Sequence, residues 1–142
     1  MRMQSAIFDW DSTFTDATGA MRPNVREFLT LMKLEDVWMY LIAKNRRNTV
    51  AQIEELDVSD YFRGIVAADE TEGEPGELCW KAARRMKLPK SMIAVFSGDP
   101  AVLRSAGEWK FRTVGVLGAF PEAEVRAAAG EVMEDFSSMV ER

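Results

Sequence analysis

Short apolar runs alternate with helical segments along all 142 residues of the chain, and this alternation limits the fold more than any other feature. The runs are predicted to be strands and lie at residues 6–8, 37–43, 62–68, 91–96 and 111–117. Helices are predicted at residues 24–33, 48–56, 75–86 and 100–106 and after Pro121, from apolar spacing or from residues that typically begin helices. Regular alternation of apolar strands with helices favours an α/β fold built on one doubly wound, Rossmann-like parallel sheet.

These patterns predict a single domain over residues 1–142, with a sheet of about five strands and helices on both of its faces. Residues 131–133 are a candidate for a further short strand, and a last helix is predicted from Asp135. Asn48 is expected to cap the helix that covers residues 48–56. No internal repeat, low-complexity tract or linker divides the sequence.

Charge and composition disfavour several classes of function. The net charge is −5, and basic residues cluster no further than pairs such as Arg46-Arg47, so an extended nucleic acid is an unfavourable partner. The longest apolar run, residues 37–43, is far shorter than the roughly 20 residues of a membrane-spanning helix. The N-terminus lacks the apolar segment of a signal peptide, and the single cysteine, Cys79, is expected to be a buried apolar side chain. We therefore expect a cytoplasmic protein that contacts no membrane.

The sequence contains no histidine. This rules out Ser-His-Asp and Cys-His nucleophilic systems, histidine-ligated zinc and acid–base catalysis by imidazole. Any catalysis must therefore use carboxylates, lysines, hydroxyls or a hard cation bound by oxygen atoms.

Polar residues follow the predicted strands at the ends where open parallel sheets bind their ligands. Asp9 and Asp11 follow the first strand, Lys44 follows the second, and Asp99 follows the fourth. The three aspartates are expected to meet at one edge, where their mutual repulsion raises their pKa values and favours a bound divalent cation. Oxygen ligands suit Mg²⁺, which keeps water molecules and binds substrate phosphate. Two alternatives stay open: the first two aspartates are turn-forming or helix-capping acids, and Asp99 caps the helix that follows it.

Residues 8–13, F-D-W-D-S-T, resemble the first motif of the haloacid dehalogenase (HAD) superfamily, an apolar strand followed by D-x-D-x-T. The resemblance continues in order through the polar tip of the second strand, D-Y-F-R-G-I-V-A-A-D-E, G-E-P and A-V-F-S-G-D-P. It ends with S-A-G-E-W-K-F-R-T-V-G-V-L-G, and this later half is especially similar to phosphoglycolate-phosphatase-like members. The matching segments cover nearly the whole sequence and imply a HAD-like core.

The resemblance implies a phosphatase that hydrolyses a phosphate monoester, such as a phosphorylated small molecule, through an aspartyl-phosphate intermediate. Asp9 would be the nucleophile, and Asp11 would protonate the leaving group and then activate water. Thr13 would belong to the substrate-binding residues and would help to hold the loop that follows the first predicted strand. Mg²⁺ would be bound by Asp9, Asp99 and the main-chain carbonyl of Asp11. Residues i and i+2 of a strand point the same way, which would let Asp9 and Asp11 flank one phosphorus atom.

Three positions depart from the family pattern. Ser12 stands where the family usually has glycine, and Lys44 stands where it has a serine or threonine that donates to the phosphate. Glu74 stands where the family has a lysine that offsets the negative charge of the nucleophile and the phosphate. We hypothesise that Lys44 has taken over this cationic role, with Glu74 as its ion-pair partner and Asn45 as a neighbouring substrate-binding residue. The alternative is that Lys44 is a solvated loop residue.

The loop that follows Thr13 is too short for the helical cap domain that many relatives insert there. A capless site implies a bulky substrate that fills it, weak and broad activity, or an oligomer that supplies the lid, which makes a homodimer plausible. The alternative to an enzyme is a catalytically impaired HAD-like protein that serves as a phosphate-binding, regulatory or assembly module. Glu74 in place of lysine favours that alternative, whereas the retention of Asp9, Asp11, Thr13 and Asp99 favours the phosphatase.

Overall fold

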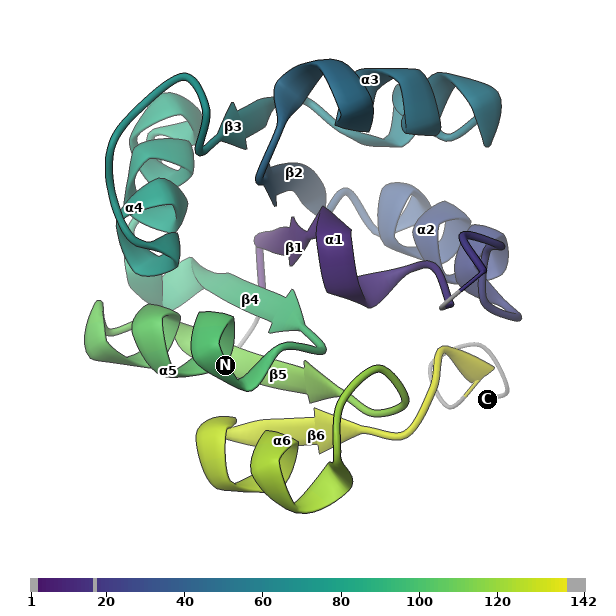
Figure 1. The fold of residues 1–142 in the computed structure, drawn as a ribbon. Coiled ribbons are helices and arrows are strands. Elements are labelled where there is room, and N and C mark those ends of the chain that lie inside the picture. Colours follow the sequence, from purple (N-terminus) through teal and green to yellow (C-terminus); the bar gives the residue numbers. More distant parts are fainter. Residues whose placement is uncertain (1–2, 17, 138–142) are drawn as a thin grey trace.

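The computed structural model describes residues 3–16 and 18–137 of the chain. Its strands are β1 (Ser5–Asp9), β2 (Trp38–Ala43), β3 (Ile65–Ala67), β4 (Ile93–Ser97), β5 (Arg112–Val116) and β6 (Glu131–Met133). They form one six-stranded sheet in the order β3-β2-β1-β4-β5-β6, in which every neighbouring pair is parallel (Figure 1). This is the doubly wound order of Rossmann-like folds. The predicted fold class is therefore confirmed, with six strands rather than about five.

Helices cover both faces of this sheet. They are α1 (Trp10–Thr13), α2 (Val25–Leu34), α3 (Arg46–Glu55), α4 (Pro75–Met86), α5 (Pro100–Glu108) and α6 (Glu122–Ala128), with short 3₁₀ turns η1 (Ser59–Tyr61) and η2 (Lys90–Met92). Along β1 the side chains alternate: Ala6 and Phe8 pack with residues of α2 and α3, whereas Ile7 packs with residues of α4 and α5. On the α5 side, Val125 of α6 packs against Leu103. Because the strands are covered on both faces, their residues are apolar almost without interruption.

Aromatic side chains fill the core on the α2 side of β1. The ring of Phe8 lies 4.9 Å from that of Phe14 and 5.0 Å from that of Phe96, measured between centroids. Trp10 is also buried there, and its indole N–H donates to Gln52 Oε1 at 2.5 Å. Large rings bury much apolar surface. These contacts therefore anchor the segment after β1, which carries Trp10 and Phe14, in the core.

Most predicted elements are confirmed, including the candidate strand at residues 131–133, which is β6. The third strand covers only Ile65–Ala67, and residues 62–64 of the predicted strand connect the η1 turn to it. The cap of α3 was predicted wrongly: Asn45, not Asn48, is the capping residue, and its Oδ1 accepts a hydrogen bond from Asn48 N at 2.9 Å. The helix therefore begins earlier than predicted. The predicted last helix lies mostly in residues 138–142, outside the described residues.

No cap domain interrupts the fold among the described residues. Between β1 and α2 these residues form the α1 turn and a loop closed by a bridge between Thr15 and Met21. Residues 68–74 make the short connection from β3 to α4. Cys79 of α4 is buried, as predicted, and burial raises the pKa of its thiol. Over the ranges that the structure describes, no helix is long and apolar enough to cross a bilayer.

The chain changes its winding direction between β1 and β4. From β1 it winds outward through β2 to β3, and α4 then carries it back to β4 on the other side of β1 (Figure 1). Because all strands are parallel, the ends of β1 and β4 meet at one edge, where doubly wound sheets open a crevice. Gly98, just after β4, approaches α1 closely: a Cβ atom on it would lie 2.5 Å from the main-chain oxygen of Ser12. The approach of the β4 tip to α1 therefore requires glycine at this position.

We predict that Gly98→Ala lowers the free energy of unfolding by about 1 to 3 kcal/mol, because the added methyl group forces two main-chain segments apart. Gly107→Ala is the matched control, since a Cβ atom at that position of α5 meets nothing within 4 Å. That control should raise stability by about 0.5 to 1 kcal/mol, as alanine favours a helix over glycine. Urea titrations followed by circular dichroism measure both changes. Equal midpoints for the two variants would contradict the prediction.

Candidate active site

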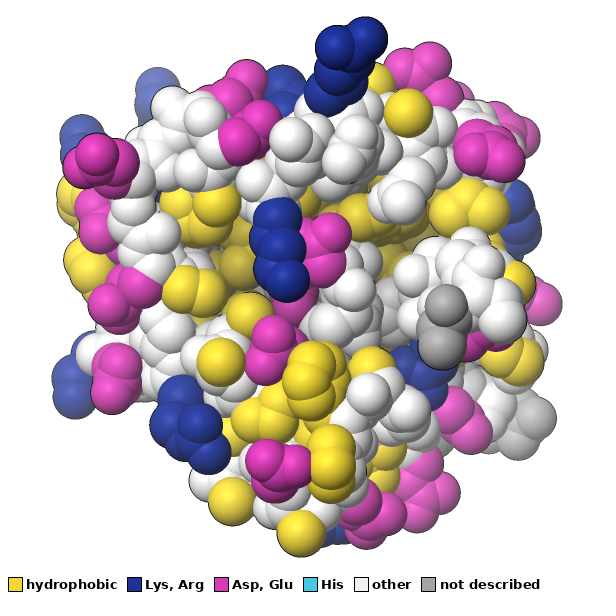
Figure 2. Space-filling model, viewed as in Figure 1, with side chains coloured by type: hydrophobic (Ala, Val, Ile, Leu, Met, Phe, Trp, Pro, Cys, Tyr) yellow, Lys and Arg dark blue, Asp and Glu magenta, His cyan; other side chains and the backbone are white. Residues whose placement is uncertain are grey.

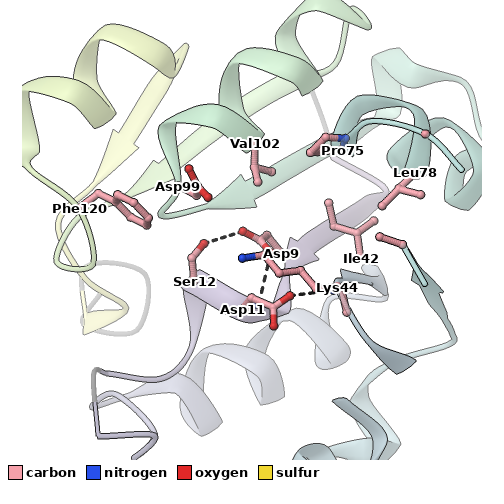
Figure 3. Close-up of a pocket in the computed structure, with 13 residues that line it drawn as sticks. Asp9, Asp11, Ser12, Ile42, Lys44, Pro75, Leu78, Asp99, Val102 and Phe120 are labelled. Carbon is pink, nitrogen blue, oxygen red and sulfur yellow. Dashed lines mark hydrogen bonds between the residues drawn. The ribbon is translucent and has the colours of Figure 1, made fainter. Parts of the chain in front are cut away.

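A pocket of about 170 Å³ opens at the edge of the sheet where β1, β2 and β4 end. Its polar lining residues are Asp9, Asp11, Ser12, Lys44 and Asp99. Its apolar lining includes Ile42, Ala43, Pro75, Leu78, Val102 and Phe120 (Figure 3). The structure therefore brings together the three aspartates and Lys44 that the sequence placed at separate strand tips.

Asp9 is the most buried acid of the pocket, with 6% of its surface exposed. It ends β1 and caps α1, because its Oδ1 accepts a hydrogen bond from Asp11 N at 3.3 Å. Its Oδ2 accepts hydrogen bonds from Ser12 Oγ at 2.6 Å and from Ser97 Oγ at 2.9 Å. Ser97 is an active-site neighbour that sequence reasoning missed, although it stands in the S-G-D segment that marked Asp99.

Burial raises the pKa of Asp9 above its ordinary value, and the hydroxyl groups of Ser12 and Ser97 oppose this rise by donating to the carboxylate. The negative charge of Asp11 raises the pKa further. A carboxylate so placed is costly to ionise in the free protein. A cation near its oxygen atoms would lower this cost. A carboxyl group with such a raised pKa is typical of binding and catalytic sites.

The two serines also join the tips of β1 and β4. Ser12 Oγ accepts a hydrogen bond from Gly98 N at 3.2 Å, and Ser97 Oγ accepts one from Asp99 N at 2.9 Å. Each hydroxyl therefore donates to Asp9 and accepts from the loop that carries Asp99. This arrangement orients the Asp9 carboxylate and fixes its position relative to Asp99.

Asp11 and Asp99 each keep one carboxylate oxygen without a hydrogen bond among the described residues. Asp11 is exposed, and its Oδ2 accepts from Lys44 N at 2.9 Å. Asp99 is half-buried and caps α5, with Oδ1 accepting from Ala101 N at 2.9 Å. The capping role that was the alternative for Asp99 is therefore present. It occupies one oxygen and leaves the other to the pocket.

The donor set fits Mg²⁺, although it is not a closed metal cage. Among the described residues, no group of three or more His, Cys, Asp or Glu side chains has the arrangement of a metal site. Mg²⁺ is usually held by one or two carboxylates together with water and substrate phosphate, rather than by an all-protein cage. Asp9 and Asp99 line one pocket and supply two carboxylates, one at the end of β1 and one from the loop after the adjacent strand β4. Asp11, whose main-chain oxygen the resemblance assigned to the ion, lines the same pocket.

Thr13 and Asn45 do not line the pocket. Thr13 is fully buried, and its hydroxyl donates to the main-chain oxygen of Phe96 at 3.5 Å. The side chain of Asn45 caps α3. The structure thus gives both residues a part in holding the loops that carry Asp9 and Lys44, rather than a place in the pocket.

The hypothesised ion pair between Lys44 and Glu74 is wrong. Glu74 Oε1 accepts a hydrogen bond from Trp109 Nε1 at 2.7 Å and one from Ser105 Oγ at 3.1 Å, so the side chain turns toward α5. These two donors lie next to the start of α4, where Gly76 N also donates to Ser105 Oγ at 2.8 Å. Lys44 does line the pocket, and its ammonium group has no ion pair among the described residues.

We predict that Asp9→Asn raises stability at pH 7 in buffer with EDTA. The pKa of folded Asp9 lies above its ordinary value of 3.8, so folded molecules bind this proton more readily. Stability is therefore greatest below the unfolded pKa and falls as the pH rises through the folded pKa. Asparagine does not ionise, so the variant avoids this loss of stability. In urea titrations, its free energy of unfolding should exceed that of the wild type by an amount that grows from acid to neutral pH.

Asp16→Asn is the control with the opposite sign, because hydrogen bonds from Thr18 lower the pKa of Asp16. The ionised form of Asp16 is stabilised above its unfolded pKa, so this variant should lose stability at pH 7 and not in acid. If the wild type were more stable than Asp9→Asn at pH 7, the ionised Asp9 carboxylate would not be destabilising, and the prediction would be wrong.

No protein-family model and no curated protein sequence matches this chain. Solved structures match it closely in shape. A protein from Bacteroides fragilis assigned as a haloacid dehalogenase-like hydrolase superimposes with a TM-score of 0.84 at 13% identity, covering 97% of this chain and 100% of its own. A haloacid dehalogenase-like family hydrolase from Streptococcus pneumoniae gives a TM-score of 0.85 at 10% identity, with 98% and 97% covered.

A third solved structure of similar fold belongs to a longer protein from Thermotoga maritima, assigned as a β-phosphoglucomutase. It superimposes with a TM-score of 0.75 at 20% identity, over 85% of this chain and 58% of its own. This chain therefore spans somewhat more than half of that protein's length, whereas it matches the two proteins above over nearly their whole length. The fold of this chain is that of the haloacid dehalogenase superfamily, as the sequence resemblance implied.

Proposed function

We propose that this protein is a Mg²⁺-dependent phosphatase that hydrolyses a phosphate monoester through an aspartyl-phosphate on Asp9. The observation that carries the proposal is the placement of Asp9: a buried carboxylate that shares one pocket with Asp11, Lys44 and Asp99 at the edge of the sheet. The solved structures of the same fold, which include hydrolases and a protein assigned as a phosphoglycolate phosphatase from Haemophilus somnus, also support it.

In the first step, an oxygen of Asp9 attacks phosphorus while the bond from phosphorus to the ester oxygen breaks. Asp11 gives its proton to that oxygen, and the alcohol leaves. In the second step, Asp11 takes a proton from water and the water oxygen attacks phosphorus while the bond from phosphorus to the Asp9 oxygen breaks, which releases inorganic phosphate and restores the Asp9 carboxylate. The exposed Asp11 side chain can turn from Lys44 N toward the leaving group, because a single hydrogen bond from the described residues holds it.

The charges of the pocket require a cation. Asp9 and Asp99, with the main-chain oxygen of Asp11, would hold Mg²⁺, which neutralises charge on the phosphoryl oxygens when bound. Lys44 is the one basic residue among the described residues that line the pocket, and we assign it to the phosphate. Two unit charges 4 Å apart interact by about 4 kcal/mol at an effective dielectric constant of about 20. A glutamate aimed at the phosphate would therefore oppose binding strongly, and Glu74 is turned away.

The second candidate is a catalytically silent phosphate-binding, regulatory or assembly module. Two observations favour it: Ser12 and Ser97 already donate to one oxygen of Asp9, and residue 74 supplies no cation. We prefer the phosphatase because, within the described part of the chain, the other oxygen of Asp9 accepts only the long hydrogen bond from Asp11 N. Expectations of a homodimer that supplies a lid and of a cytoplasmic location stay predictions.

The protein is predicted to hydrolyse p-nitrophenyl phosphate with Mg²⁺ and not with EDTA, and Asp9→Asn is predicted to abolish this activity. The amide cannot form the covalent phosphoryl intermediate, so the loss should reach the limit of detection. Release of p-nitrophenol measures turnover, and trapping of phosphorylated protein in acid measures the intermediate. Equal turnover by the wild type and Asp9→Asn, on this and a panel of phosphorylated metabolites, would favour the silent module.

Lys44→Ala is predicted to lower kcat/KM by about 10- to 100-fold, the value of one hydrogen bond to a charged group. Glu74→Gln is the control, because glutamine keeps the acceptor oxygen for Trp109 and Ser105 and removes the charge. Its kcat/KM should change by less than about twofold, since the side chain points away from the pocket. If Lys44→Ala retained full activity, the phosphate would have to be held by other groups.

A further inference from the structure

One side of the active-site pocket is apolar. Ile42 from β2, Pro75 and Leu78 from α4 and Val102 from α5 lie together at this side, away from Ser12 (Figure 3). Ile42 and Leu78 are buried. In the space-filling view, hydrophobic side chains surround acidic and basic ones near the centre of this face (Figure 2). A leaving group bound to phosphate at Asp9 would therefore meet hydrocarbon.

Phe120 borders the same pocket from the loop after β5, with 42% of its surface exposed. It is one of the few large apolar side chains that the described residues leave exposed. An exposed ring beside a pocket can cover an apolar ligand and lose water by doing so. Phe120 lies next to Asp99 and Ser12, across the pocket from Ile42 and Leu78, and adds a second apolar contact at that end (Figure 3).

This apolar lining is unsuited to a sugar or another polyhydroxyl leaving group. The side chains of Ile42, Pro75, Leu78 and Val102 offer no hydrogen-bond donor or acceptor. Hydroxyl groups of a ligand would lose their hydrogen bonds to water there without replacement, which is unfavourable.

The charge of the pocket is also unsuited to a second acidic group on the substrate. Asp9, Asp11 and Asp99 face a single ammonium group, that of Lys44, among the described lining residues. Mg²⁺ and Lys44 are both needed by the phosphate itself, so a leaving-group carboxylate would have no cation of its own. It would also be repelled by the aspartates.

Arg22, in the adjoining hollow, does not supply the missing cation. This hollow shares Asp11, Ser12 and Phe120 with the active-site pocket. The guanidinium donates to the main-chain oxygen of Leu117 at 2.6 Å and to that of Thr13 at 3.4 Å. It is also near the charge of Asp135. These hydrogen bonds hold the guanidinium against the main chain of Thr13 and of Leu117, outside the active-site pocket.

The pocket volume limits how much of a leaving group the pocket can enclose. An apolar cavity of roughly 150 Å³ accepts a molecule the size of benzene, and this pocket holds about 170 Å³. The phosphate takes part of that space at the polar side, so the pocket encloses about one ring of hydrocarbon, and the rest of a larger leaving group would extend into solvent.

From these observations we propose that the substrate is a phosphate monoester of an uncharged, apolar alcohol, of which the pocket encloses a part about the size of one benzene ring. Phosphorylated sugars and phosphorylated carboxylic acids are poor substrates. This inference rests on the phosphatase function proposed above and assigns specificity to Ile42, Leu78, Val102 and Phe120.

Binding of two phosphonates that cannot be hydrolysed tests the inference without turnover. Calorimetry in Mg²⁺ compares benzylphosphonate, which carries an apolar ring, with phosphonoacetate, which carries a carboxylate. Benzylphosphonate should bind at least about tenfold more tightly. Val102→Arg places a cation at the apolar side and should reverse the preference. Ala101→Arg is the matched control, because Ala101 precedes Val102 on α5 and does not line the pocket; its preference should stay that of the wild type.

Turnover of benzyl phosphate and of phosphoglycolate provides the second readout. Both are esters of primary alcohols, so a difference in kcat/KM reports recognition, and benzyl phosphate should be preferred at least about tenfold. Tighter binding of phosphonoacetate, equal binding of the two phosphonates or binding of neither would overturn the proposed substrate class. Selective binding of benzylphosphonate without turnover of either ester would support that ligand class and reject the phosphatase instead.

Discussion

The Asp9 carboxylate is buried where the tips of β1 and β4 meet, and the geometry of the site follows from the need to satisfy it. An unpaired charge at this depth is costly. Ser12 and Ser97 reduce the cost by donating to it, and each accepts a main-chain N–H from the loop that carries Asp99. The same two hydroxyls thus hold the charge and align the two strand tips.

The core below the site keeps these tips in place. Phe8, Phe14 and Phe96 pack together on one face of β1, and Trp10 is buried beside them. Gly98 lets the β4 tip come within contact of the α1 main chain. Because close-packed interiors deform little, this packing fixes the tips of β1 and β4 relative to each other. No cap domain covers the pocket among the described residues, and two residues of its apolar side, Ile42 and Leu78, also belong to the core of the sheet.

Sequence reasoning placed the pocket correctly and described its walls incompletely. Asp9, Asp11, Lys44 and Asp99 were found because each follows a strand, and parallel strands end at one edge. Thr13 and Asn45 also follow strands, yet they turn into the structure to hold loops. Ser97 was missed because a serine inside an apolar strand carries no signal until its neighbours are known. The apolar residues of the pocket were likewise indistinguishable from core residues.

By itself, the sequence determined the order of strands and helices, and hence that one edge of a parallel sheet would carry the acids. The β–α alternation is local, and the right-handed connection of parallel strands follows from it. Tertiary structure alone decided where each polar side chain turns. Glu74 points away from the pocket because Trp109 and Ser105, distant in the chain, donate hydrogen bonds to it. Contacts between residues so far apart in the chain arise only when the helices pack, so the direction of such a side chain cannot be inferred from its neighbours in sequence.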